Sequence, residues 1–443
     1  MNKKDIIVVG AGISGLTAAF DLQKQGHKVT VLEASDITGG RMADIALKGL
    51  NIHTGATIIW DNFKDMMDLV AELGIKDKLV PYSSEDYRVN NGQSEYDIRF
   101  HFSVTNMLAH PAFSASSKLK LAKLLPDIIK SGLKTDPCLM HTAAEFDTES
   151  VADYLTDKGV TDFLENFVEP LFRAPWNWEP EEFSKAYLLT MCGHLPGSKT
   201  FTFQDGIGAL TRELAKHLTI HHKSKVVSID DNSDQACVVV VEKEGVEEVL
   251  TADLVVFTAQ ADRARQLVKS LSEEEAKFFD SVKYNSCGIV YYILNKPVPP
   301  DLKWFTRKHS SPVVFYAQIP EDENVPEGHV QPPHLYLELT PQVRDRAAAE
   351  NNIGNLDQYA RAFAKDMYPQ LDENLRDVVE QWVPQMLPLW YPGYAKKVAN
   401  FIENREKDPR RVYFAGDYLS QSHTGGACAS GRRAARLISL HWQ

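Results

Sequence analysis

The stretch DIIVVGAGISGLTAAFDLQKQGHKVTVLEAS, residues 5–35, decides the fold of the N-terminal region. Residues 6–9 form a continuous β-branched run, which predicts a strand buried on both faces. Residues 16–25 have the apolar spacing of a helix, and residues 29–32 predict a second strand parallel to the first. Between the first strand and the helix, a G-x-G-x-x-G pattern is formed by Gly10, Gly12 and Gly15.

This pattern predicts a site for the pyrophosphate of a dinucleotide. Gly10 permits the tight turn, Gly12 lets the phosphate approach the backbone, and Gly15 lets the helix pack on the strand. Glu33 ends the second strand, where it can accept hydrogen bonds from an adenosine ribose. The expected nucleotide contacts are Gly10, Gly12, Ile13, Ser14, Gly15, Glu33 and Ala34.

The closing stretch RVYFAGDYLSQSHTGGACASGRRAARLI, residues 411–438, has a related design. Residues 412–415 predict a short buried strand, and a helix of small residues follows from Gly426. A glycine-rich turn between strand and helix directs backbone N–H groups at an anion or a polar ring edge. By themselves these residues fit a ligand contact and a tight packing turn equally well.

Glu33-Ala34 is followed by Gly39-Gly40-Arg41, and a second small-residue turn covers residues 54–57. This order resembles the flavin-containing amine oxidase superfamily, which includes monoamine and polyamine oxidases, protoporphyrinogen oxidases and phytoene-desaturase-like enzymes. The resemblance implies FAD as the cofactor, with the Gly-Gly-Arg loop against its pyrophosphate and isoalloxazine. It adds the contacts Gly39, Gly40, Arg41, Gly55, Ala56 and Thr57.

The same resemblance assigns a role to the closing stretch. It implies that Asp417 binds a ribityl hydroxyl and that the last helix directs N–H groups at the flavin N1/O2 edge, where negative charge gathers on reduction. It also puts the backbone of Val226 beside the adenine. The further implied contacts are Val226, Gly416, Asp417, Thr424, Gly425, Gly426 and Ala427.

A chain of 443 residues is too long for one compact core. We expect an α/β plus α+β architecture with two discontinuous domains. Residues 1–76, 200–281 and 382–443 are predicted to form a Rossmann-like FAD-binding domain. Residues 77–199 and 282–381 are predicted to form a substrate-binding domain with a mixed sheet and helices.

Composition excludes several other classes of protein. The formal net charge of −12 disfavours nucleic-acid binding, which uses basic surfaces. Five scattered cysteines without a CxxC pair predict neither a metal site nor a disulfide framework. The sequence shows no apolar run of membrane-spanning length, and its start has no signal-peptide pattern, so we expect a cytoplasmic location.

Catalytic residues are less clearly indicated. Residues 380–401 resemble the family segment that crosses the flavin near the substrate, which favours Tyr391 and its neighbour Trp390. His423 is a candidate polar group, with a helix-capping role as the alternative. Trp176 and Trp382 are further pocket candidates, and for Trp176 ordinary packing is an equal alternative.

Cys287 marks a departure from the family pattern. Many amine oxidases of this family carry a lysine that holds a water against flavin N5. Aligning the strand around residues 289–292 places Cys287 at that position, and Lys283 lies too early. Protoporphyrinogen oxidases and carotenoid-type desaturases also lack the lysine. A buried structural cysteine is the commoner interpretation, and a redox-active thiol is the alternative.

These features predict an FAD-dependent oxidase or dehydrogenase that takes hydride from a C–H bond next to nitrogen or in a reduced, conjugable small molecule. A protoporphyrinogen-oxidase-like or desaturase-like enzyme and an FAD-dependent isomerase are the alternatives. The expected partners are a hydrophobic or amine substrate and molecular oxygen or another electron acceptor. A non-enzymatic escort protein is disfavoured because Glu33, Arg41 and Asp417 are all present.

Residues 116–134 predict an amphipathic helix with five lysines, interrupted by Pro126. The favoured interpretation is a helix whose apolar face packs on the substrate domain. A helix that contacts a membrane surface is the alternative.

Overall fold

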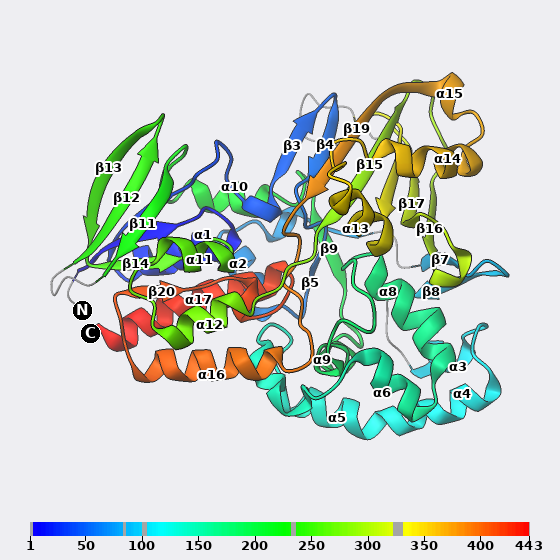
Figure 1. The fold of residues 1–443 in the computed structure, drawn as a ribbon, viewed down its shortest axis with the longest axis horizontal. Coiled ribbons are helices and arrows are strands. Elements are labelled where there is room, and N and C mark those ends of the chain that lie inside the picture. The colour runs from blue at the N-terminus through cyan, green and yellow to red at the C-terminus, as the bar shows by residue number, and fades with distance from the viewer. Residues whose placement is uncertain (1–2, 83–85, 100–103, 232–235, 322–330, 443) are drawn as a thin grey trace.

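The structure is a computed structural model that describes residues 3–82, 86–99, 104–231, 236–321 and 331–442 (Figure 1). Its largest sheets are a five-stranded parallel sheet, a three-stranded antiparallel sheet and a seven-stranded mixed sheet. A hairpin pairs β3 (Asp44–Leu47) with β4 (Leu50–His53), and a small ladder contains β5 (Ile59–Trp60), β6 (Leu79–Pro81) and β9 (Thr200–Phe203).

The parallel sheet has the strand order β10-β2-β1-β14-β20. Its strands are β1 (Asp5–Val9), β2 (Lys28–Leu32), β10 (Thr219–His221), β14 (Leu254–Phe257) and β20 (Val412–Phe414). Val8 of β1 pairs with Val31 on one side and Val256 on the other, and all three are fully buried. This confirms that residues 6–9 form a strand buried on both faces.

Helices α1 (Ile13–Lys24) and α17 (Thr424–His441) pack against each other beside this sheet (Figure 1). A Cβ atom on Gly431 of α17 would lie 2.3 Å from the carbonyl oxygen of Ser14 in α1. The missing side chain therefore allows the close approach of the two helices. As a result, the first and last helices of the chain become neighbours.

The seven-stranded sheet has the order β19-β15-β18-β17-β16-β7-β8. Its strands are β7 (Asp86–Asn90), β8 (Glu95–Arg99), β15 (Cys287–Leu294), β16 (Asp301–Phe305), β17 (Val313–Ile319), β18 (His334–Leu339) and β19 (Leu375–Val383). One face packs on α13 (Pro341–Ala349) and α14 (Asp357–Met367) through side chains such as Leu335 and Leu337. The other face carries Cys287 and Tyr291 and packs against Leu50 of the β3–β4 hairpin.

The three-stranded sheet consists of β11 (Lys225–Asp230), β12 (Cys237–Lys243) and β13 (Val246–Ala252). The remaining α-helices are α2 (Lys64–Glu72), α3 (Val104–Ala109), α4 (Ala115–Lys120), α5 (Leu125–Lys134), α6 (Val151–Lys158), α7 (Thr161–Phe163), α8 (Glu169–Arg173), α9 (Lys185–His194), α10 (Ala209–Ala215), α11 (Ala261–Leu267), α12 (Glu273–Asp280), α13 (Pro341–Ala349), α14 (Asp357–Met367), α15 (Leu371–Asn374) and α16 (Tyr394–Lys407). Among the helices of the described ranges, none is long and apolar enough to cross a bilayer.

The mixed α/β architecture with parallel and antiparallel sheets agrees with the sequence prediction, while the exact domain boundaries stay predictions. The favoured interpretation of residues 116–134 is wrong for part of its apolar face, because Leu119, Ile129 and Leu133 are exposed. A 3₁₀ turn (Leu121–Leu124) separates α4 from α5. A 3₁₀ turn has fewer residues per turn than an α-helix, so it changes which side of the segment faces the interior.

Candidate functional site

The turn after β1 has the geometry that the G-x-G-x-x-G pattern predicts. Gly10 has a φ of +103°, a backbone conformation that favours glycine. A Cβ atom on Gly15 would lie 2.1 Å from the carbonyl oxygen of Gly10, so only glycine lets α1 pack this closely. A Cβ atom on Gly12 would meet nothing within 4 Å. Gly12 therefore borders space in which a pyrophosphate can approach the backbone.

The N-terminus of α1 provides hydrogen-bond donors for an anion. Gly12 is the N-cap residue, and no side chain caps the helix there. The hydroxyl of Ser14 is buried and has no partner among the described residues. Free N–H groups and a free hydroxyl at a positive helix end suit a phosphate, so this part of the site fits the pyrophosphate of FAD.

Glu33 follows β2 and lies beside the glycine turn. Its Oε2 accepts a hydrogen bond from the Ala11 N–H at 2.7 Å, and its Oε1 accepts one from the Ser35 N–H at 2.8 Å. These bonds hold the carboxylate at the carboxyl end of the parallel sheet, the edge at which doubly wound folds bind nucleotides. The position fits a ribose contact.

Val226 lies in β11, which follows closely on a segment that contacts Glu33. The N–H of Ser224 donates to the carbonyl oxygen of Glu33 at 2.8 Å. Val226 pairs with Val241 of β12, and the register then shifts before Ser228. A bulge of this kind leaves backbone groups without ladder partners, as a backbone contact to adenine requires.

The Gly39-Gly40-Arg41 loop packs against the first glycine turn. The Gly39 N–H donates to the carbonyl oxygen of Ala11 at 2.8 Å, and a β-bridge joins Gly12 to Gly39. Gly39 and Gly40 have φ values of +119° and +57°. The two glycine turns are therefore adjacent and have no side chains between them.

Arg41 and Asp417 join the two ends of the chain. Nη1 lies 2.8 Å from Oδ2, and Nη2 donates to Oδ1 at 2.9 Å, which makes the pair bidentate. Nη1 also donates to the carbonyl oxygen of Met386, and the Ala56 N–H donates to the Arg41 carbonyl oxygen. Burial acts to lower the pKa of Arg41, but the Asp417 carboxylate outweighs it and raises that pKa. The resemblance assigns each residue separately to FAD, and the structure shows that they also bind each other.

The start of α17 lies next to the end of β20. The Gly416 N–H donates to the hydroxyl of Ser430 at 3.0 Å. A Cβ atom on Gly425 would lie 2.4 Å from the ring of Phe63, so this glycine is required for packing. The Thr424 hydroxyl is buried and unpartnered within the described part of the chain. Together with the positive helix end, this hydroxyl fits a polar ring edge such as flavin N1/O2.

His423 caps α17. Its Nδ1 accepts a hydrogen bond from the Gly426 N–H at 3.0 Å, and its carbonyl oxygen accepts one from the Ala427 N–H. Those two N–H groups are therefore already bound, which leaves Thr424 and Gly425 as the expected backbone donors to the flavin. Nε2 of His423 lies 3.3 Å from the carbonyl oxygen of Pro137, and burial lowers the pKa of His423 to about 3. The imidazole is neutral, and both ring nitrogens are engaged.

Tyr391 and Trp390 have surroundings of a different kind. The Tyr391 hydroxyl donates to the carbonyl oxygen of Ser281 at 2.9 Å, next to α12, and accepts from Lys397 of α16 at 3.0 Å. Lys283 lies over its ring at 4.8 Å. Trp390 is buried, and its ring centroid is 4.9 Å from that of Tyr394. Catalytic roles for Tyr391 and Trp390 stay predictions.

An aromatic wall, which we define as Trp60, Phe63, Trp176, Tyr187 and His423, lies beside the start of α17. The ring of Trp60 is 6.3 Å from Trp176 and 6.1 Å from His423, and the His423 ring stacks on Phe63 at 4.0 Å. Nε1 of Trp176 donates to the Tyr187 hydroxyl at 3.0 Å. Sequence reasoning missed Trp60, Phe63 and Tyr187, although the position of Trp60 just after the 54–57 turn is a usable signal.

Trp382 is not part of this wall. It belongs to the hydrophobic cluster that the large sheet forms with α13 and α14, on the face opposite to Cys287. The structure therefore does not bring Trp382 to the aromatic wall, and its pocket role stays a prediction. Successive residues of a strand point to opposite faces, and Val383, not Trp382, lies on the face that carries Cys287.

Cys287 begins β15 within a buried polar cluster. Its thiol donates to Oε1 of Glu338 at 3.3 Å, and the same carboxyl group accepts from the Asn177 amide and the Tyr336 hydroxyl. Burial raises the pKa of Glu338 to about 8, against the lowering effect of these hydrogen bonds. Burial also raises the pKa of Cys287. The thiol is therefore protonated, which fits the interpretation as a buried structural cysteine.

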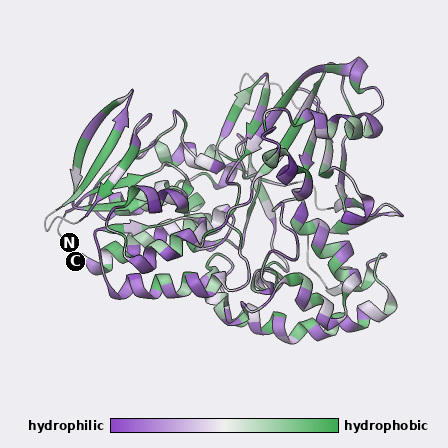
Figure 2. Ribbon diagram, viewed as in Figure 1, coloured by the Kyte–Doolittle hydropathy of each residue, from purple (hydrophilic) through white to green (hydrophobic). Residues whose placement is uncertain are grey.

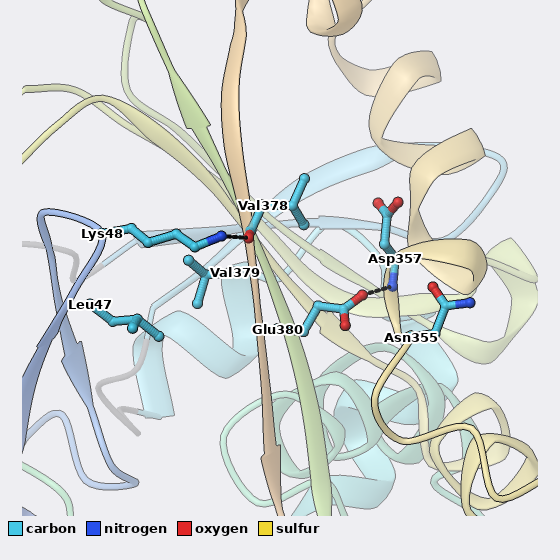
Figure 3. Close-up of a pocket in the computed structure, with 7 residues that line it drawn as sticks. All are labelled: Leu47, Lys48, Asn355, Asp357, Val378, Val379 and Glu380. Carbon is cyan, nitrogen blue, oxygen red and sulfur yellow. Dashed lines mark hydrogen bonds between the residues drawn. The ribbon is translucent and has the colours of Figure 1, made fainter.

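A surface depression of about 420 Å³ lies elsewhere (Figure 3). It is lined by Leu47, Lys48, Asn355, Asp357, Val378, Val379 and Glu380. Two of its charged side chains are paired: Lys48 donates to the carbonyl oxygen of Val378, and Glu380 accepts from the Asp357 N–H (Figure 3). None of the predicted site residues lines it, so we assign it no part in the site.

Comparisons with known proteins agree with this geometry. Residues 13–439 match the model of the family described as flavin containing amine oxidoreductase. Protoporphyrinogen oxidase 2 of Arabidopsis thaliana is 24% identical, over 98% of this chain and 94% of its own length. The solved structure of cyclohexylamine oxidase from Brevibacterium oxydans IH-35A is similar, with a TM-score of 0.72 at 18% sequence identity. The solved structure of putrescine oxidase bound to putrescine is similar too, with a TM-score of 0.72 at 16% sequence identity. Each comparison covers 99% of both chains.

At these identities the two solved structures show the fold alone, whereas the family match covers almost the whole chain. The glycine turns, the uncapped helix end and the free hydroxyls of Ser14 and Thr424 fit FAD independently of that match. The chain therefore belongs to the flavin-containing amine oxidoreductases and is an FAD-dependent oxidoreductase.

Proposed function

We propose that this enzyme removes a hydride from a C–H bond next to the nitrogen of an apolar amine. The iminium ion that forms loses its N–H proton to solvent, which yields an imine. Bound FAD supplies the hydride acceptor, and molecular oxygen or another acceptor takes the electrons. The observation that carries the proposal is the aromatic wall beside the start of α17, the helix end that fits the flavin edge.

The aromatic wall favours a small apolar substrate. Trp60 and Trp176 are both buried, and their rings lie 16° from parallel. Packed aromatic side chains exclude water and present apolar surface to a ligand, while a few polar groups fix its orientation. Here those polar groups are the Tyr187 hydroxyl and the Thr424 hydroxyl next to the wall.

Among the described residues near the aromatic wall, His423, Cys287 and Glu338 supply no strong base. His423 is neutral and uses both ring nitrogens, and the Cys287 thiol is protonated. The Glu338 carboxyl, with a pKa of about 8, has little charge at neutral pH to attract an ammonium ion. A neutral amine needs no base for hydride loss, because the hydride leaves with the C–H electron pair while the nitrogen lone pair forms the C=N bond. The residues therefore favour the neutral amine as the reacting form.

A second candidate is oxidation at carbon to form a C=C bond, as in protoporphyrinogen-oxidase-like or desaturase-like enzymes. Cys287 favours it, because many amine oxidases of the family carry a lysine at this position, whereas protoporphyrinogen oxidases and carotenoid-type desaturases lack that lysine. Both candidates share the aromatic wall, and they differ in whether the substrate contains the reacting nitrogen.

The visible spectrum of the purified protein under anaerobic conditions tests both candidates. Amines and reduced cyclic precursors are added one at a time, and bleaching of the flavin band identifies a substrate. Bleaching by an amine with formation of an imine supports the proposal, and bleaching only by a nitrogen-free or porphyrinogen-type compound supports the second candidate. A protein that no compound bleaches, but that rearranges a substrate once its flavin is chemically reduced, contradicts both and indicates an isomerase.

A further inference from the structure

Helices α4 and α5 carry an apolar row on their outer side. This outer row consists of Leu119, Leu125, Ile129 and Leu133, which are 79, 43, 60 and 82% exposed. Positions 125, 129 and 133 are four residues apart and so share one side of α5. The two helices run along the lower edge of the molecule in Figure 1, where apolar and polar segments alternate along the ribbon (Figure 2).

The inner side of α5 carries Ile128, which packs on the main core, and small residues. Ser131 is fully buried. A Cβ atom on Gly132 would lie 3.0 Å from the carbonyl oxygen of Gly193, so α5 packs closely on α9 through two glycines. In most surface helices the large apolar side chains face the core. Here Ile128 and Leu124 face the core in that way, but Leu125, Ile129 and Leu133 face solvent as well, and an exposed apolar row of this kind marks a surface that binds a partner.

Lysines flank the outer row. Residues 115–134 contain Lys118, Lys120, Lys123, Lys130 and Lys134, with Asp127 as the single acid. Lys130 and Lys134 are about half exposed and share one carboxylate, that of Glu145. The whole chain has a net charge of −12, so the positive charge of this segment is a local exception. Two copies of the segment facing each other would bring these lysines together, which disfavours self-association.

We infer that α4 and α5 bind the surface of a lipid bilayer that contains anionic lipids. The outer row would enter the boundary between headgroups and acyl chains, and the lysines would lie at the level of the phosphates. Apolar burial and charge attraction then act together, as they do for other helices that lie in the plane of a membrane.

The location has a consequence that rests on the proposed function. Residues 135–140 lead directly from α5 to the candidate site, where the carbonyl oxygen of Pro137 lies 3.3 Å from Nε2 of His423 and the Met140 N–H donates to Ser420. A bilayer at α5 therefore lies on the side of the molecule from which an apolar substrate would reach the aromatic wall.

Vesicle sedimentation of the full-length, FAD-loaded protein tests the inference. We expect the protein to sediment with vesicles of phosphatidylcholine and phosphatidylglycerol, and less with phosphatidylcholine alone. The variant with Leu125→Gln, Ile129→Gln and Leu133→Gln should lose at least about tenfold in partitioning, a lower bound for three apolar side chains. The matched control carries Val246→Gln and Val249→Gln on β13, which are 69 and 64% exposed outside α4 and α5. It should partition like the wild type.

Flavin content and the unfolding temperature show whether each variant is folded, and exposed side chains should change neither. The inference is overturned by a wild type that stays in the supernatant with anionic vesicles, or by a triple variant that still binds them. Self-association of the wild type that the triple variant abolishes would assign the row to a second copy instead. Sedimentation is read without turnover, so any of these results leaves the proposed function untouched.

Discussion

Asp417 and Glu338 both have buried carboxyl groups, but Asp417 binds a cation, whereas the hydrogen-bond donors to Glu338 are neutral. Both amino groups of the Arg41 guanidinium bind Asp417. Neutral donors such as the Cys287 thiol and the Asn177 amide bind Glu338, and its pKa is raised to about 8. Asp417 is therefore held by a cation, whereas burial raises the pKa of Glu338 against the lowering effects of its neutral hydrogen-bond donors and of Arg344.

Asp417 and Glu338 lie in two different regions of the molecule, which we call the nucleotide side and the substrate side. The nucleotide side contains the glycine turns, the Arg41–Asp417 pair and the start of α17, and there fixed charges and backbone N–H groups prepare a site for an anionic cofactor. The substrate side contains the aromatic wall and the buried cluster of Glu338, and it presents apolar and neutral surfaces. The contrast fits the proposed oxidation of a neutral amine beside an anionic cofactor.

The largest effect is expected when the Arg41–Asp417 pair is broken. Arg41→Met leaves the Asp417 carboxylate buried without a cation, which should cost about 3 kcal/mol of unfolding free energy, the low end for a buried pair because the Arg41 side chain is 33% exposed. The FAD-to-protein ratio should also fall. Urea unfolding and the absorbance of released flavin measure the two effects.

Arg405→Met is a control for this prediction, since Arg405 pairs with Glu275 and their side chains are 11 and 9% exposed. Glu275 keeps a second ion pair with Arg410, so this variant should lose less stability than Arg41→Met and keep its FAD. If Arg41→Met retained FAD at the wild-type ratio, the pair would be structural only and the nucleotide side would lose its distinguishing charge.

Glu338→Gln examines the neutral carboxyl. Folded Glu338 keeps its proton up to a pH of about 8, while the unfolded chain loses it near its ordinary pKa of 4.5, so this group costs stability as the pH rises through that window. Glutamine does not titrate. Between about pH 5 and about pH 6.5 the variant should therefore gain on the order of 2 kcal/mol relative to the wild type. A difference that does not change with pH would show an ionised Glu338 and erase the contrast with Asp417.

Gly12→Ala separates cofactor binding from folding on the nucleotide side. Its Cβ atom meets nothing within 4 Å, so the unfolding free energy of the apoprotein should stay within about 0.5 kcal/mol of the wild type. The methyl group enters the space beside the phosphate, so the Kd for FAD should rise about tenfold. Gly15→Ala is the counterpart: its Cβ would collide with the Gly10 carbonyl oxygen, and the fold itself should weaken. Equal behaviour of the two variants would remove the assignment of Gly12 to the cofactor.

The smallest effect concerns His423, at the border of the two regions. Asn is also a good N-cap residue, so His423→Asn should change stability little at neutral pH. Folded His423 stays neutral down to a pH of about 3, whereas the unfolded histidine gains a proton below its ordinary pKa of 6.5, so wild-type stability falls as the pH drops through 6.5. At a pH near 5.5 the variant should be favoured by about 1 kcal/mol. Thermal unfolding at both pH values measures this, and equal losses would show that the imidazole accepts a proton in the folded state.

Much of the nucleotide side follows from the sequence because its elements are local. A β-branched run, glycines at fixed spacing and an acid after the second strand are close neighbours along the chain, and the structure has them as β1, the turn with Gly10 at positive φ, and Glu33 after β2. The substrate side is different. Glu338, Cys287 and Asn177 come from three distant segments, and no pattern along the chain links them.

The sequence by itself determined the parallel sheet, the glycine turns and the family to which the chain belongs, because backbone conformation and strand burial depend mainly on adjacent residues. Only the tertiary structure decided which distant groups meet: Arg41 with Asp417, 376 residues away, and Trp60 with Trp176. It also decided that the outer row of α5 faces solvent. Periodicity shows that a helix has an apolar side, but the direction of that side depends on how the helix packs, which here is set by the contact of Gly132 with Gly193.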